Sequence, residues 1–169
     1  WCNQFNVTKV DKSDRSANAK KMAGGLAIFS TDARGSRSCS HPNASQGVSF
    51  YGDSFCMCRD VMDEDTFPWY LGELRGTRVS NYGDGNYGLD QALLRLRRDY
   101  KRDPGKTVVL AVTTITMARC VSVYRHYLEP GNIFAIKPRF CLNDDGTLNT
   151  VKYPLTQKQN LLKLEQFKE

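Results

Sequence analysis

The stretch VSFYGDSFCMC, residues 48–58, runs from an apolar segment directly into Gly52-Asp53-Ser54 and then into a second apolar segment. This pattern predicts a buried strand over 48–52 and a helix that begins at Ser54 and continues toward residue 62. Ser54 then stands on the turn between them. Two roles fit that position: a nucleophile displayed on a strand-to-helix turn, or a helix cap after a buried strand. The rest of the chain has to decide between them.

The residues that follow repeat this alternation of strand and helix. A second helix has Asp65 or Thr66 as its N-cap, Pro68 in its first turn and Gly76 at its end. Further strands are expected over 77–83 and 107–114, and further helices over 89–100 and 116–128. Strands and helices that alternate in this way predict an α/β fold, with a parallel sheet covered by helices on both sides.

Two segments add detail to this outline. The strand over 107–114, TVVLAVTT, is apolar nearly throughout, which predicts that it is buried on both faces. Residues 137–155 predict a hairpin or extended excursion with Asp144-Asp145-Gly146 as its turn. A lysine-rich amphipathic segment covers 156–169.

The composition is that of an ordinary globular protein. The chain has 169 residues, of which 40% are hydrophobic and 25% are charged, so we expect one domain with a single substantial core. No run of about eighteen apolar residues is present, and no secretory apolar region opens the chain, so no membrane span or signal peptide is expected. The compartment stays open, with the cytoplasm favoured, and so does the oligomeric state.

The net charge of +6 allows two interpretations. A basic protein can bind anionic partners, here through Arg95, Arg98 and Arg102 in RLRRDYKR. The alternative, which we favour, is a solvated surface that happens to be basic. No nucleic-acid-binding motif accompanies the basic residues, so no nucleic-acid partner is expected.

The six cysteines do not have the paired spacing of a zinc site. We expect most of them to be small buried hydrophobic residues, and disulfides stay open. No metal or organic cofactor is expected.

Three unusual loops are expected at one edge of the sheet. They are Gly52-Asp53-Ser54, residues 81–86 and residues 113–116, and each follows a predicted strand. Ligands bind beyond the carboxyl ends of the strands in open α/β sheets. Glycine lets the backbone approach a ligand closely, and N–H groups at a helix start face a developing negative charge. A serine on one loop with backbone donors on the next is the arrangement of an oxyanion hole, which favours the nucleophile role for Ser54.

In these blocks the chain resembles the SGNH, or GDSL-type, hydrolases, and especially a bacterial subgroup described only as SGNH-type hydrolases. The similarity rests on Gly52-Asp53-Ser54, on VSNYGDGNYGLDQALLRL, and on VYRHYLEPGN and KPRF, and it extends over residues 30–155. It implies a three-layer α/β/α, flavodoxin-like fold. It also implies that Ser54 is the nucleophile and that the N–H groups of Ser54 and of Asn86 or Gly85 hold the oxyanion. Asp53 is expected to order the turn through hydrogen bonds to nearby backbone.

The chain departs from this family in two places. Thr116, or Thr114, stands where the family has an asparagine that completes the oxyanion hole. The family's late Asp-x-x-His motif is absent, and the chain contains only His41 and His126. His126 is expected to be a surface or packing residue, so His41 is the candidate base. Either the functional chain continues beyond Glu169, or another group replaces the histidine, or the domain no longer catalyses. We favour the first, so that 1–47 is an N-terminal extension and loop, and 48–169 is an SGNH-like domain that lacks its C-terminal block.

The expected function is a serine ester hydrolase that acts on an acyl ester. The resemblance implies a small-molecule or glycan substrate, such as a carbohydrate O-acetyl ester. Phe50, Tyr51, Tyr82 and Tyr87 could line the pocket, although core packing is the better reading for Phe50. Two alternatives stay open: an O-acetyltransferase that uses the same acyl-enzyme, and a non-catalytic SGNH-like module that binds a glycan or a partner.

Overall fold

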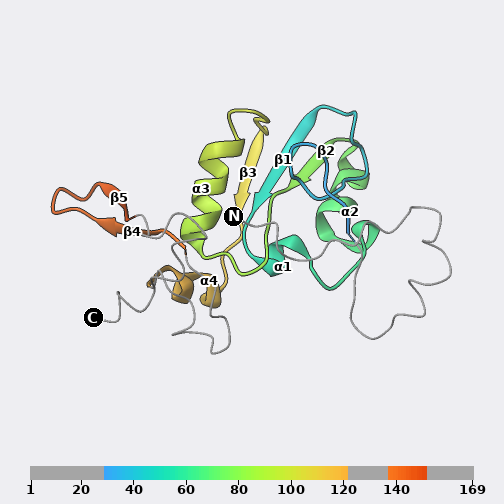
Figure 1. Cartoon of the computed structure of the whole chain (residues 1–169). Coiled ribbons are helices and arrows are strands. Elements are labelled where there is room, and N and C mark those ends of the chain that lie inside the picture. The colour runs from blue at the N-terminus through green and yellow to red at the C-terminus, as the bar shows by residue number, and fades with distance from the viewer. Residues whose placement is uncertain (1–28, 122–136, 152–169) are drawn as a thin grey trace.

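The computed structural model describes residues 29–121 and 137–151. Its centre is a parallel sheet of three strands in the order β2-β1-β3 (Figure 1). The strands are β1 (Gln46–Tyr51), β2 (Arg78–Asn81) and β3 (Thr107–Leu110). Helices and a parallel sheet occur together, so the predicted α/β class is confirmed.

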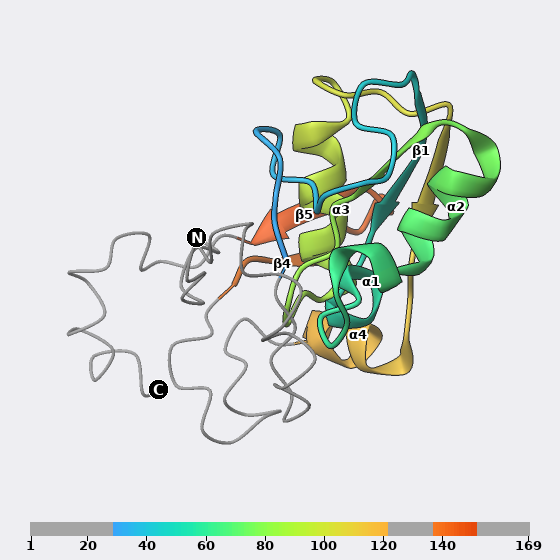
Figure 2. The same ribbon diagram turned by 90° about the vertical axis from the view of Figure 1, so that its right-hand side faces the viewer.

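The helices follow the strands along the chain. They are α1 (Ser54–Met57), α2 (Phe67–Arg75), α3 (Leu89–Asp99) and α4 (Thr114–Ala118), with two 3-10 turns, η2 (Asp63–Asp65) and η3 (Arg119–Val121). Figure 2 shows α2 and α3 on either side of β1. Among the described residues, no helix is long and apolar enough to cross a membrane.

In the part of the chain that the structure describes, the core consists of two clusters that share β1. Tyr51 packs with Tyr82, Tyr87 and Ala92, and Leu96 of α3 lies against this cluster. Phe50 packs with Cys56 and Val79, and Leu71 of α2 lies against that cluster, together with Val48, Val109 and Ala111. Because neighbouring side chains of a strand point to opposite faces, Phe50 and Tyr51 place the two clusters on opposite faces of the sheet.

Local signals set the ends of α2 as predicted. The Thr66 side chain accepts a hydrogen bond from Trp69 N, and Gly76 ends the helix with a φ of +59°. A left-handed glycine is the usual helix terminator, because it has no Cβ to clash. The helix predicted from Ser54 is shorter than expected: α1 ends at Met57, because Cys58 adopts a left-handed conformation with a φ of +59°.

The predicted burial of the third strand is wrong. Among the described strands, β3 pairs only with β1 and lies at the edge of the sheet. Val108 and Leu110 are each 37% exposed. An apolar strand is buried only where other strands or helices cover both of its faces. The strand also ends at Leu110, and α4 begins at Thr114, two residues earlier than predicted.

The predicted hairpin is present and packs against α3. It consists of β4 (Arg139–Leu142) and β5 (Leu148–Val151), which pair in antiparallel fashion. Gly146 takes a φ of +77° in the turn. The buried Lys137 ammonium group donates to the buried Asp90 carboxylate of α3, which ties the start of the hairpin to this helix.

Residues 29–45, which precede β1, are built into the fold. Arg37 N donates to Asn81 O at the end of β2 (2.9 Å), and β1 itself begins at Gln46. Several features considered in the sequence lie outside the described residues: Cys2, His126, most of the helix predicted over 116–128 and the predicted segment 156–169.

Candidate functional site

Three loops meet at the carboxyl edge of the sheet, where Figure 1 shows α1 and α4. The N–H of Asp84, after β2, donates to Gly52 O at the end of β1 (3.1 Å). The Thr113 hydroxyl, after β3, donates to Asp53 Oδ2 (3.2 Å). The structure therefore joins the loops that carry Ser54, Asn86 and Thr116.

Ser54 is the first residue of α1, and its neighbour Asp53 is the cap. Asp53 Oδ1 accepts hydrogen bonds from Phe55 N (3.0 Å) and Cys56 N (3.4 Å). Ser54 is partly exposed, and within the described part of the chain its hydroxyl makes no hydrogen bond. The capping role that the sequence left open for Ser54 thus belongs to Asp53.

Two glycines allow the neighbouring loops to press against α1. A Cβ on Gly52 would lie 2.6 Å from Cys56 Cβ and 3.0 Å from Ala111 O. A Cβ on Gly83 would lie 2.5 Å from Met57 N. No larger residue fits at either position without a shift of backbone, so α1 packs directly against the chain that follows β1 and β2.

The loop after β2 contains the second set of expected donors. Asn86 has a φ of +69°, in the left-handed region that asparagine tolerates better than other residues with a Cβ. A Cβ on Gly85 would meet no atom within 4 Å. Asn86 is therefore the position in this loop whose backbone conformation favours glycine.

Asn81 is a residue of this site that sequence reasoning missed. Its amide group donates to Cys56 O in α1 (2.9 Å), and its Oδ1 accepts from Gly83 N (3.0 Å). One side chain thus links the Ser54 helix to the loop of Asn86. Residues 81–86 were expected at this edge, but nothing in the sequence links Asn81 to its partner Cys56 on α1.

The Thr116 side chain makes its hydrogen bonds within the cap of its own helix. It is buried, its hydroxyl donates to Thr113 O (2.6 Å), and its oxygen accepts from Thr113 N (2.8 Å). Thr113 and Thr116 together cap the start of α4. In this arrangement the Thr116 hydroxyl proton is not directed at a ligand. Thr114 is exposed at the first position of α4.

The structure does not bring His41 to Ser54. His41 Nε2 lies 3.5 Å from Glu73 Oε1, near the end of α2. The loop of His41 continues to Ser45, whose carbonyl accepts from Arg78 N at the start of β2 (3.1 Å). This is the amino edge of the sheet, whereas Ser54 follows the carboxyl end of β1. A strand of six residues spans roughly 20 Å at about 3.3 Å per residue.

Arg119 is a second residue that sequence reasoning missed. Its Nη1 lies 3.6 Å from Asp53 Oδ2 and donates to Tyr87 O (3.1 Å). Arg119 and Asp53 are far apart in the chain, and no spacing in the sequence links them. Their contact arises only when β1 and β3 pair and bring the following loops together.

The aromatic residues expected in the pocket pack in the core instead. Tyr51 and Tyr82 stack with ring centroids 5.1 Å apart, and both are fully buried. Burial raises the pKa of Tyr51 to about 12 and also raises the pKa of Tyr82. Burial likewise raises the pKa of the Cys56 thiol to about 12. These groups stay protonated at neutral pH, so none of them supplies a base beside Ser54.

The predicted basic face is reduced because Arg95 turns inward. Its side chain is buried against Asp84 (3.2 Å) and Asp99 (3.4 Å), and its guanidinium lies over the Tyr82 ring. Arg98 pairs with Asp99 at 2.6 Å. Acidic partners thus neutralise Arg95 and Arg98, two of the three arginines of the predicted anion-binding face.

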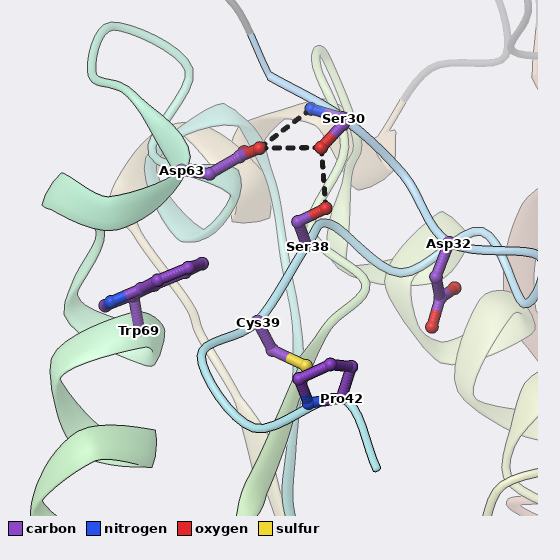
Figure 3. A pocket seen from close by; sticks show the side chains of 7 residues that line it. All are labelled: Ser30, Asp32, Ser38, Cys39, Pro42, Asp63 and Trp69. Carbon is purple, nitrogen blue, oxygen red and sulfur yellow. Dashed lines mark hydrogen bonds between the residues drawn. The ribbon is translucent and has the colours of Figure 1, made fainter. Parts of the chain in front are cut away.

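A cavity of about 290 Å³ lies elsewhere, between residues 30–42 and α2 (Figure 3). It is lined by Ser30, Asp32, Ser38, Cys39, Pro42, Asp63 and Trp69, none of which belongs to the loops around Ser54. Its polar groups bond to each other: Ser30 donates to Asp63 (2.8 Å), and Ser30 and Ser38 share a bond of 2.6 Å. The free Cys39 thiol also lines the cavity, and burial raises its pKa, so it stays protonated at neutral pH. Within the described ranges, no cluster of three His, Cys, Asp or Glu residues could hold a metal ion.

No family model, curated protein or solved structure matches this chain. The geometry around Ser54 is therefore the basis for a functional assignment.

Proposed function

We propose that the protein is a serine ester hydrolase of SGNH type, with Ser54 as its nucleophile. The observation that carries this proposal is the place of Ser54: it begins α1 at the carboxyl end of β1, and Asp53 rather than Ser54 caps the helix. Its hydroxyl is thus left available for attack on a carbonyl carbon. The proposal includes the three-layer, flavodoxin-like arrangement, which the two core clusters on opposite faces of the sheet support.

The proposed oxyanion hole uses backbone donors. In acyl transfer the carbonyl oxygen gains negative charge as Ser54 Oγ attacks, and preorganised N–H groups stabilise it. The N–H of Ser54 and the N–H of Asn86 or Gly85 fill this role in the proposal. The hydrogen bonds from Asp84 N to Gly52 O and from Asn81 to both loops support it, because they fix the two donor loops relative to each other.

The reaction also needs a base that accepts the Ser54 proton. His41 pairs with Glu73 at the opposite edge of the sheet, so the proposal takes its base from outside the described residues. The alcohol leaves with a proton, and water then releases the acid from the acyl-enzyme. The proposed substrate is a small-molecule or glycan O-acetyl ester, by resemblance. An O-acetyltransferase would pass the same acyl group to an alcohol instead of water.

One observation favours a second candidate, a non-catalytic module that binds a glycan or a protein partner. Thr116 stands where the family has its oxyanion asparagine, and its hydroxyl is used in the cap of α4. Loss of one oxyanion donor costs roughly 10²–10³ in turnover. A domain that no longer catalyses is free to lose this donor.

Labelling with a fluorophosphonate, read by intact mass, decides between the two candidates. We expect one adduct on the natural gene product and none on Ser54→Ala. Ser45→Ala is the matched control, because Ser45 is an exposed serine before the opposite end of β1, and it should label like the parent protein. A folded natural gene product that takes no adduct would exclude the hydrolase and favour the binding module. An adduct on the 169-residue chain itself would show that the base lies within it.

A further inference from the structure

One buried guanidinium group contacts both loops that carry the proposed oxyanion donors. Arg119 is 5% exposed, and its Nη1 donates to Tyr87 O (3.1 Å) while lying 3.6 Å from Asp53 Oδ2. Tyr87 directly follows Asn86, and Asp53 directly precedes Ser54. Arg119 therefore holds the residue next to each proposed donor.

The Asp53 carboxylate connects this contact to α1. Asp53 is 1% exposed, and its Oδ1 accepts from Phe55 N and Cys56 N in the first turn. Its Oδ2 faces Arg119 and accepts from the Thr113 hydroxyl (3.2 Å). A buried carboxylate needs such compensation, because an unpaired charge is costly in a low-dielectric interior. The orientation of α1 is thus coupled to the position of Arg119.

The loop after β2 fits closely around the same side chain. A Cβ on Gly88 would lie 3.2 Å from Arg119 Cβ and 2.6 Å from Asp90 Oδ1. Gly88 follows Tyr87, so the backbone after Asn86 is in contact with both the guanidinium group and the stem of Arg119. Arg119, from η3, therefore contacts both loops, in addition to the bonds that Asn81 and Asp84 make between them.

We infer that Arg119 is a positioning residue that holds the N–H groups of Ser54 and Asn86 in the geometry of one oxyanion hole. This inference rests on the proposed function. Donors must be placed within about 0.5 Å to act together on a developing charge. The planar fork of arginine can bond two partners in fixed directions, whereas lysine carries a point charge. A lysine at position 119, which keeps the charge but not the planar fork, should therefore not fully restore the role of Arg119.

The first test compares Arg119→Gln and Arg119→Lys with Arg102→Gln, a control on an exposed arginine. Saturation kinetics of fluorophosphonate labelling separate the binding constant of the probe from the rate of bond formation at Ser54. We expect the rate to fall by about 10²-fold in Arg119→Gln with little change in probe binding, as for a lost oxyanion donor. Arg119→Lys should recover only part of that loss. An unchanged rate in a folded Arg119→Gln variant would overturn the inference.

A second readout does not depend on reactivity. In Arg119→Gln, amide hydrogen exchange should be faster than in the parent protein at two places together. These are Phe55 and Cys56, which Asp53 caps, and Asn86 and Tyr87. Acceleration in only one of the two loops, or in neither, would overturn the role of Arg119. If Arg119→Gln does not fold, Arg119→Lys gives the same readout, because it keeps the buried charge. A parent protein that takes no label would contradict the proposed function alone, and the exchange pattern would still decide the role of Arg119.

Discussion

Asn86 is the residue of the candidate site whose backbone conformation can be tested most directly. Its φ of +69° costs a residue with a Cβ about 1–2 kcal/mol relative to the right-handed region, and glycine avoids this cost. Asn86→Ala and Asn86→Gly both remove the asparagine side chain and its contacts. We therefore expect the alanine variant to be less stable than the glycine variant by about 1 kcal/mol in urea unfolding.

Gly85→Ala is the control for this comparison. Its Cβ would meet no atom within 4 Å, and its φ does not lie in the left-handed region, so its unfolding free energy should stay within about 0.5 kcal/mol of the parent value. Equal stabilities for the two Asn86 variants would show that the loop relaxes out of the left-handed conformation.

Single residues also show what the sequence could and could not predict about the site. Gly52-Asp53-Ser54 was predictable as a turn, because the strand and helix that flank it have strong local patterns. Asn81 and Arg119 were not, because their partners lie on other loops and meet them only in the folded sheet. The Thr116 hydroxyl could not be assigned either, since its capping bonds depend on where α4 begins.

At the level of single elements, α1 needs support from outside itself. It has four residues, far fewer than an isolated helix needs to be stable in water. Arg37 supplies that support: its Nη1 donates to Met57 O (2.6 Å) and Cys58 O (2.7 Å), and its Nη2 donates to Val61 O (2.6 Å). Its Nε pairs with the buried Asp63 carboxylate at 2.8 Å. One arginine thus satisfies the carbonyl groups where α1 ends.

We expect Arg37→Met to lower the free energy of unfolding by about 3–5 kcal/mol, because it leaves the Asp63 carboxylate without its buried ion pair. Arg34→Met is the matched control. Arg34 pairs with Asp32 at 2.7 Å but is 41% exposed, so its loss should cost at most about 1 kcal/mol. The measurement is the urea midpoint of each variant. Similar losses in both would mean that the Arg37 contacts are replaced by water.

Whole elements were predicted unevenly, for a physical reason. The ends of α2 and the hairpin turn depend on Thr66, Gly76 and Gly146, whose preferences are local. The exposure of β3 depends on which strands lie beside it, and TVVLAVTT carries no information about its neighbours. Local chemistry therefore predicts where elements begin and end better than how deeply they are buried.

At the scale of the whole molecule, buried carboxylates make stability depend on pH. Burial alone would raise the pKa of Asp103, but hydrogen bonds from Arg78 and Tyr82 and the charge of Arg78 outweigh it, so its pKa is lowered. Burial would also raise the pKa of Asp99, but Arg98 and Arg95 lower it. A carboxyl whose pKa is lower in the folded state binds fewer protons than in the unfolded state. Its contribution to stability is present above the unfolded pKa and is lost as the pH falls through the folded pKa.

We therefore expect the free energy of unfolding to be nearly constant between pH 5 and pH 7, and to fall steeply below about pH 4, the unperturbed range for aspartate. Asp103→Asn should lower stability at pH 7 and should flatten this acid dependence. Urea unfolding at a series of pH values measures both effects. A variant with the same acid slope as the parent protein would show that other groups dominate the acid response.

Arg37 is synthesised before any of the carbonyl groups that it holds, because it precedes β1 and they follow it. During translation the full set of Arg37 contacts can form only after Val61 has left the ribosome, so Arg37 stays without them until then. A fragment that starts at Val48, the predicted start of the SGNH-like domain, would lack this arginine. We expect such a fragment to be less stable than the 169-residue chain, with α1 as the first part to be cut by a protease.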